Sequence, residues 1–131
     1  MPSDPTLHIL LVDDNSDNRE LILAYLKNTP YRVTVALDGA QALDLFTQDR
    51  YDLVVMDMQM PVMDGYTAAR AIRDWERTNN RSSTPIVALT AFALKGDEEK
   101  CLEAGCTVYL TKPIKKATLF AAISKYASQG T

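Results

Sequence analysis

The sequence Leu53-Val54-Val55-Met56-Asp57 decides the fold of this chain. Four consecutive apolar residues are typical of a strand that helices cover on both faces, and a charged residue ends the run. Among the short apolar runs of the chain, the one at 33–36 is the least apolar, so we expect it to form a strand at the edge of the sheet. The other short apolar runs that predict strands are Ile9–Val12, Val33–Ala36, Ile86–Leu89 and Val108–Leu110.

Stretches with the 3.6-residue period of helices separate these runs, and a further helix is expected from about Lys95 to Ala104. Strands that alternate with helices form parallel sheets through right-handed crossovers. We therefore predict an α/β fold, a flavodoxin-like doubly wound sheet of five parallel strands in the order 2-1-3-4-5 with five helices. The apolar helical stripes are Leu21, Ile22, Tyr25 and Leu26; Ala42, Leu43 and Phe46; Ala68, Ala71, Ile72 and Trp75; and Leu119, Ala122, Ile123 and Tyr126.

Length and composition limit the class of protein. The 131 residues fit one domain over 1–131, with a core over about 7–127, and 47% hydrophobic residues exclude a disordered chain. A net charge of −3 disfavours nucleic-acid binding, and no apolar run reaches the length of a membrane span. Cys101 and Cys106 are expected to be reduced core residues, which favours a soluble cytoplasmic protein.

Local signals predict where several elements begin and end. Asp38 and Asp64 are expected to cap the second and third helices at their N-termini, because a short acidic side chain can accept a hydrogen bond from the first turn. Pro30 is expected to close the first helix and Gly105 the fourth. His8 precedes the first strand and is interpreted as a structural residue.

The third helix carries a basic stripe of Arg70, Arg73 and Arg77. Asp74 and Glu76 are interleaved with the arginines, so we expect a solvated face and favour it over a patch that binds a partner.

Polar residues follow the predicted strands at their carboxyl ends. Asp13 and Asp14 come after the first strand, Asp57 after the third, Thr90 after the fourth and Lys112 shortly after the fifth. In the 2-1-3-4-5 order, the strands with these residues are neighbours, and ligands of such sheets bind at this end. We therefore expect the five side chains to meet in one crevice.

The electrostatics of such a crevice favour a bound cation. Two carboxylates about 5 Å apart repel by roughly 3 kcal/mol at an effective dielectric constant of about 20, and one lysine cannot neutralise three of them. Hard oxygen ligands at an open site select Mg²⁺, which also binds phosphate oxygens. Asp57 is then the expected nucleophile for a phosphoryl group, with Lys112 and Thr90 beside the transferred oxygens.

Four sequence motifs, taken together and in their order along the chain, resemble the receiver domain of two-component response regulators. The resemblance covers about Leu7 to Ala127 and includes the receivers of hybrid histidine kinases in particular. The motifs are Leu-Leu-Val-Asp13-Asp14-Asn, Met56-Asp57-Met-Gln-Met-Pro61-Val-Met-Asp64-Gly65, Ala88-Leu-Thr90-Ala91 and Tyr109-Leu-Thr-Lys112-Pro113.

The resemblance implies a role for each metal-site residue. Asp57 would accept the phosphoryl group from a histidine kinase or a histidine-phosphotransfer domain. Asp14, Asp57 and the backbone carbonyl of Gln59 would bind Mg²⁺ directly, and Asp13 would act mainly through a coordinated water.

It also implies how the phosphoryl group is held and sensed. Lys112, Thr90 and the backbone amides of Gln59 and Ala91 would hold the phosphoryl oxygens, and the bond between Lys112 and Pro113 would be cis. Thr90 and Tyr109 would form a switch that changes the surface of the fourth helix, fifth strand and fifth helix.

Several functions remain to be distinguished. A phosphoacceptor domain that is not a turnover enzyme is favoured, as part of a hybrid kinase or as a stand-alone response regulator, either monomeric or a phosphorylation-dependent dimer. An aspartyl-phosphate hydrolase of the haloacid-dehalogenase type would need a second Asp two residues after Asp57, where this chain has Gln59. A flavodoxin-like FMN carrier is disfavoured because Asp13 and Asp14 would repel its phosphate.

Overall fold

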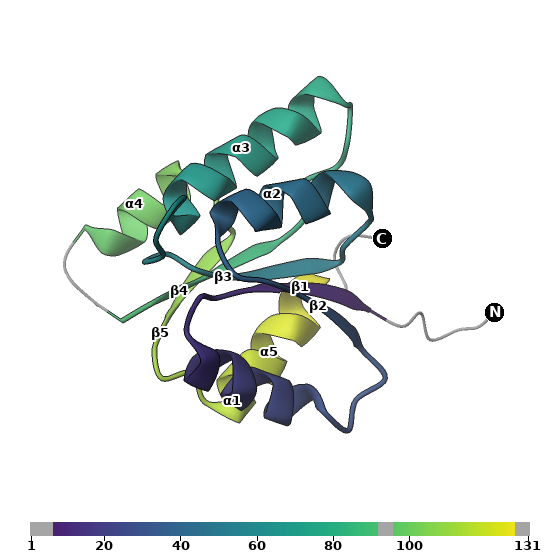
Figure 1. Cartoon of the computed structure of the whole chain (residues 1–131), viewed down its shortest axis with the longest axis vertical. Coiled ribbons are helices and arrows are strands. Elements are labelled where there is room, and N and C mark those ends of the chain that lie inside the picture. Colours follow the sequence, from purple (N-terminus) through teal and green to yellow (C-terminus); the bar gives the residue numbers. More distant parts are fainter. Residues whose placement is uncertain (1–6, 92–95, 128–131) are drawn as a thin grey trace.

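A computed structural model describes residues 7–91 and 96–127 of the chain. Its core is one sheet of five parallel strands in the order β2-β1-β3-β4-β5, which confirms the predicted order (Figure 1). The weakest apolar run forms the edge strand β2, as expected. The strands are β1 (His8–Val12), β2 (Arg32–Ala36), β3 (Leu53–Asp57), β4 (Ile86–Thr90) and β5 (Val108–Thr111).

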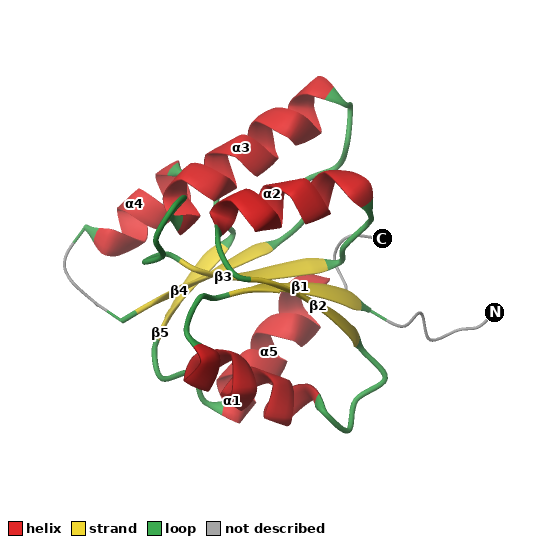
Figure 2. Ribbon diagram, viewed as in Figure 1, coloured by secondary structure: helices red, strands yellow, loops and turns green. Residues whose placement is uncertain are grey.

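Helices cover both faces of the sheet. Figure 2 shows α2, α3 and α4 on one face and α1 and α5 on the other, which is the doubly wound arrangement. Among the helices of the described ranges, none has the length and apolar character needed to cross a membrane. The helices are α1 (Ser16–Leu26), α2 (Gly39–Gln48), α3 (Gly65–Thr78), α4 (Asp97–Glu103) and α5 (Lys116–Tyr126).

Two hydrophobic clusters, one on each face, explain why the central strands are apolar throughout. Along β3, Val54 and Met56 belong to the cluster under α2 and α3, whereas Leu53 and Val55 belong to the cluster under α1 and α5. Because successive strand side chains point to opposite faces, a strand buried on both faces needs apolar residues at every position.

Most predicted boundaries are correct. The Asp38 and Asp64 carboxylates accept hydrogen bonds from the first turns of α2 and α3, and Gly105 takes a left-handed conformation with a φ of 106° directly after the Ala104 cap of α4. The predicted start of the fourth helix at Lys95 lies outside the described residues. Pro30 does not end the first helix, which stops at Leu26.

The prediction for His8 was wrong in position. His8 is the first residue of β1 and is buried, where its ring lies 2.7 Å from Thr34 Oγ1 and 2.9 Å from the carbonyl oxygen of Arg50. Its role is structural, as expected, because these contacts join β1 to the neighbouring edge strand and to the loop before β3.

Candidate functional site

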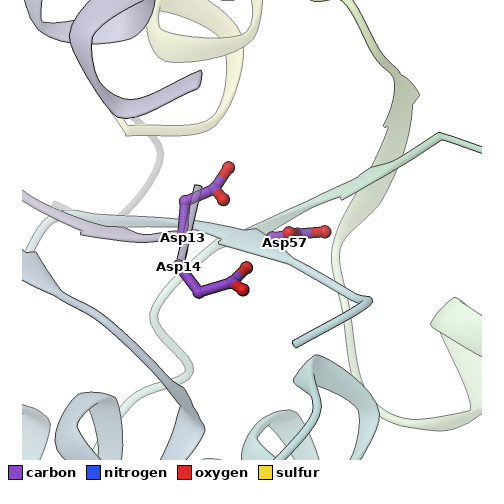
Figure 3. Close-up of side chains that lie close together, drawn as sticks. All are labelled: Asp13, Asp14 and Asp57. Carbon is purple, nitrogen blue, oxygen red and sulfur yellow. The ribbon is translucent and has the colours of Figure 1, made fainter. Parts of the chain in front are cut away.

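The predicted site residues lie together at the carboxyl end of the sheet. Asp57 ends β3 and Thr90 ends β4, while Asp13 and Asp14 directly follow β1. Both β1 and β4 pair with β3, so the three strand ends are adjacent. Figure 3 shows the side chains of Asp13, Asp14 and Asp57, which lie close together.

The three carboxylates form a tight cluster with one ammonium group. Asp13, Asp14 and Asp57 each offer an oxygen within 4.8 Å of the others. Lys112 Nζ lies 2.9 Å from Asp57 Oδ2 and 3.7 Å from Asp13 Oδ2. Asp13 and Asp57 are buried and Asp14 is exposed, so the cluster opens to solvent on the side of Asp14.

Asp13 is fully buried, which disfavours the charged form of its carboxyl group. Burial raises the pKa of its carboxyl above the usual 3.8, and the nearby Asp57 raises it further, while the Asn15 amide and Lys112 oppose the rise. Its Oδ1 accepts a hydrogen bond from the Asn15 amide at 2.9 Å. Its Oδ2 is buried and accepts no hydrogen bond within the described part of the chain. A buried carboxylate oxygen without a donor is a costly arrangement that a cation would relieve.

The donor set fits Mg²⁺. Hard carboxylate oxygens from two or three acids, with open coordination positions toward solvent, match the preference of Mg²⁺ for few protein ligands and several waters or phosphate oxygens. Asp13, Asp14 and Asp57 are the residues that could hold the ion.

Asp13→Asn is expected to stabilise the metal-free protein near neutral pH. Burial of the Asp13 charge and repulsion from Asp57 outweigh the hydrogen bond from the Asn15 amide and the attraction to Lys112, so a neutral amide at this position removes a net penalty. Because the folded pKa of Asp13 is raised, the wild type loses stability as pH rises from 3.8 through that folded value, so the advantage of the variant grows over the same window.

Urea unfolding at several pH values, with and without Mg²⁺, measures this difference. The same substitution should reduce the stabilisation that added Mg²⁺ gives, because a ligand that binds the folded state stabilises it according to its affinity. A variant that is less stable than the wild type in the absence of metal would contradict the electrostatic argument.

Gln59 makes contacts that the sequence did not predict. Its backbone N–H donates to Asp57 Oδ1 at 3.0 Å, which helps to orient the carboxylate. Its side-chain amide donates to Thr90 Oγ1 at 3.3 Å, and its Oε1 accepts from the Ala91 amide at 3.4 Å. The Gln59 side chain therefore spans the ends of β3 and β4.

The remaining predicted residues lie on β5 and just after it. Tyr109 is a half-buried residue of β5 that packs against the cluster under α2 and α3. It pairs with Ala88 in the register of β4, two residues before Thr90. The bond between Lys112 and Pro113 is cis, as the resemblance implied.

The fold and the site together define a class of protein. It is a doubly wound α/β domain in which an acidic cluster beside a lysine could hold a metal ion at the carboxyl ends of adjacent strands. A sequence profile of the response regulator receiver domain matches residues 9–124, and the chain therefore belongs to this family of two-component phosphorelay domains.

Curated relatives include sensor kinases. Sensor protein GacS of Pseudomonas syringae pv. syringae is 42% identical over 118 residues, which are 90% of this chain and 13% of that protein. Hybrid signal transduction histidine kinase I of Dictyostelium discoideum is 41% identical over 121 residues, which are 88% of this chain and 7% of that protein. The chain thus spans a small part of these relatives.

Solved receiver domains have the same fold. One belongs to a sensor histidine kinase of Pseudomonas aeruginosa PAO1 and holds a magnesium ion in its active site cleft; it has a TM-score of 0.84 and 44% identity, covering 95% of this chain and 99% of that chain. Another, from Saccharomyces cerevisiae, was crystallised with a histidine phosphotransfer signaling protein; it has a TM-score of 0.91 and 31% identity, covering 99% of this chain and 95% of that chain.

Proposed function

We propose that Asp57 is the phosphoacceptor of this receiver domain. A carboxylate oxygen of Asp57 attacks the phosphorus of a phosphohistidine, the P–N bond breaks, and its electron pair returns to the imidazole nitrogen. The product is an acyl phosphate on Asp57. The observation that carries the proposal is the environment of Asp57, which is buried at a strand end with Lys112 Nζ 2.9 Å from its Oδ2.

The neighbouring groups suit this transfer. Mg²⁺ bound by Asp13, Asp14, Asp57 and the Gln59 carbonyl would supply positive charge opposite the phosphoryl oxygens. Lys112 would pair with another of those oxygens, and the Thr90 hydroxyl would donate to a third. The side chains of Asp57 and Lys112 already lie in contact at the carboxyl end of the sheet, so the acceptor and its positive partner are in place when the donor arrives.

We also propose that Thr90 and Tyr109 transmit the modification. Thr90 would move toward the phosphoryl group, and the Tyr109 ring would rotate inward from β5. The two positions are close in the β4–β5 register, because Thr90 pairs with Thr111 and Ala88 with Tyr109. The altered packing would change the surface formed by α4, β5 and α5.

The proposed partners are a histidine kinase and a histidine-phosphotransfer protein. Similarity to segments of hybrid kinases favours a receiver within such a kinase over a stand-alone regulator, working in the cytoplasm as a monomer or a phosphorylation-dependent dimer. Gln59 stands where a phosphatase of the haloacid-dehalogenase type would carry its acid–base carboxylate. We therefore propose a domain that stores the phosphoryl group as a signal.

Titration with Mg²⁺ and beryllofluoride tests the proposal. Beryllofluoride mimics a phosphoryl group on a carboxylate, so both additions should shift the NMR amide signals of Met58, Gln59 and Ala91. Signals that stay unchanged through both additions would overturn the proposed function.

A further inference from the structure

The arginine stripe on α3 is only in part the solvated face that the sequence predicted. Arg70 and Arg77 are exposed, but the Arg73 side chain is 14% exposed and the Glu76 side chain 3%. Arg73 Nη1 lies 2.8 Å from Glu76 Oε1 in a charge-assisted hydrogen bond. The spacing of three residues places both on the same side of the helix, facing the protein.

Arg73 also binds two carbonyl groups outside its own helix. Its Nε donates to the Gly105 carbonyl at 2.8 Å, and its Nη1 donates to the Thr84 carbonyl at 2.8 Å. Glu76 completes the network, because its Oε2 accepts from the Thr84 amide at 2.8 Å. One buried ion pair on α3 therefore fixes both the entry to β4 and the turn that follows α4.

The packing at Gly105 makes this attachment tight. A Cβ atom at Gly105 would lie 2.7 Å from Arg73 Cγ, so the backbone of the turn rests directly on the arginine side chain. The C-terminal end of α4 is thus held by a hydrogen bond and by close contact with α3.

The other end of α4 is supported differently. Gly96 precedes it with a φ of 95° and provides no side-chain cap, and among the described residues other than its chain neighbours, no atom lies within 4 Å of the place that a Cβ would occupy. A groove of about 540 Å³ lies between this end of α4 and the loop after β3. Asp97 and Lys100 of α4 line one side, and Met58 and Gln59, next to the acceptor, line the other.

We infer that α4 pivots about the contact between Arg73 and Gly105 when the acceptor site changes state. The clamped C-terminal turn stays in place, and the N-terminal turn moves across the groove toward or away from Met58 and Gln59. The inference rests on the proposed function, since it assumes that modification of Asp57 alters this end of the sheet. It assigns Arg73 and Glu76 the role of a hinge support for α4, a role that the chemistry at Asp57 does not require.

Backbone amide spectra with and without Mg²⁺ and beryllofluoride test the pivot. In the wild type, the chemical-shift changes at residues 97–99 should be several times larger than those at 104–106. In Arg73→Met, which keeps the length of the side chain and removes its donors, the changes at 104–106 should rise to match those at 97–99. Arg70→Met, an exposed arginine on the same helix, is the matched control and should behave as the wild type.

The possible outcomes distinguish a failure of the proposed function from a failure of the α4 pivot. If the signals of Met58 and Gln59 do not respond to beryllofluoride, the proposed function fails and the pivot fails with it. If they respond but 97–99 and 104–106 change equally in the wild type, the pivot alone is wrong. If residues 97–99 still change several times more than 104–106 in Arg73→Met, then Arg73 does not support the hinge. The comparison of residues 97–99 with 104–106 in the wild type needs no variant, so it can overturn the inference even if Arg73→Met does not fold.

Discussion

Asp57→Ala is expected to abolish labelling of the domain by acetyl phosphate in the presence of Mg²⁺. The substitution removes the carboxylate that forms the new bond to phosphorus, and no other nucleophile in the described site has Lys112 as close. Intact-mass spectrometry at neutral pH, where an acyl phosphate survives the measurement, should show one added phosphoryl group in the wild type and none in the variant.

Two controls make the result specific. Asp44→Ala removes an exposed carboxylate from α2 and should be labelled as the wild type is. Urea unfolding should show that Asp57→Ala is folded, because the substitution also relieves repulsion from Asp13 and Asp14. Labelling of the variant at the wild-type rate would show that Asp57 is not the acceptor.

The sequence predicted the strands well because burial on both faces leaves a simple pattern. The predicted runs of β1 and β3, and that of β4, are apolar at every position, and these three strands end at or just before a polar residue of the site. The structure extends each of the five predicted runs by one residue, and at the carboxyl ends of β3 and β4 the added residues are Asp57 and Thr90. The convergence of the site followed from topology, because parallel neighbours place their carboxyl ends at one edge.

The buried pair on α3 was missed although a signal was present. Glu76 follows Ala68 and Ile72 at intervals of four residues, so helical periodicity places it on the apolar face. The interpretation as a solvated face relied on charge alone. Its partners in space, the Thr84 amide and the Gly105 carbonyl, depend on loop paths that periodicity does not specify.

The Gln59 contacts could not be predicted for a related reason. They depend on the backbone path of the loop after β3, which places the Gln59 side-chain amide beside Thr90, the last residue of β4, and Ala91, which follows it. Local pattern identifies where a strand ends, but the conformation of the following loop arises from tertiary packing.

Glu76→Ala is expected to lower the free energy of unfolding by about 3 kcal/mol, because removal of one partner leaves a largely buried charge unpaired. It would also leave the Thr84 amide without its acceptor on Glu76. Asp74→Ala is the matched control, since it breaks an ion pair of the same i, i+3 spacing that is 69% and 73% exposed and should cost less than about 1 kcal/mol.

The double variant Arg73→Met with Glu76→Met distinguishes the charge from the packing. Replacing both members of a buried pair by apolar side chains of similar volume is often close to neutral, so the double variant should be more stable than Glu76→Ala. Urea unfolding of the four proteins measures the series. If Glu76→Ala and Asp74→Ala cost the same, the network on α3 contributes no more than a surface ion pair, and its attachment of the turns before β4 and after α4 is energetically unimportant. If Glu76→Ala alone is costly, the buried pair is what holds those turns in place.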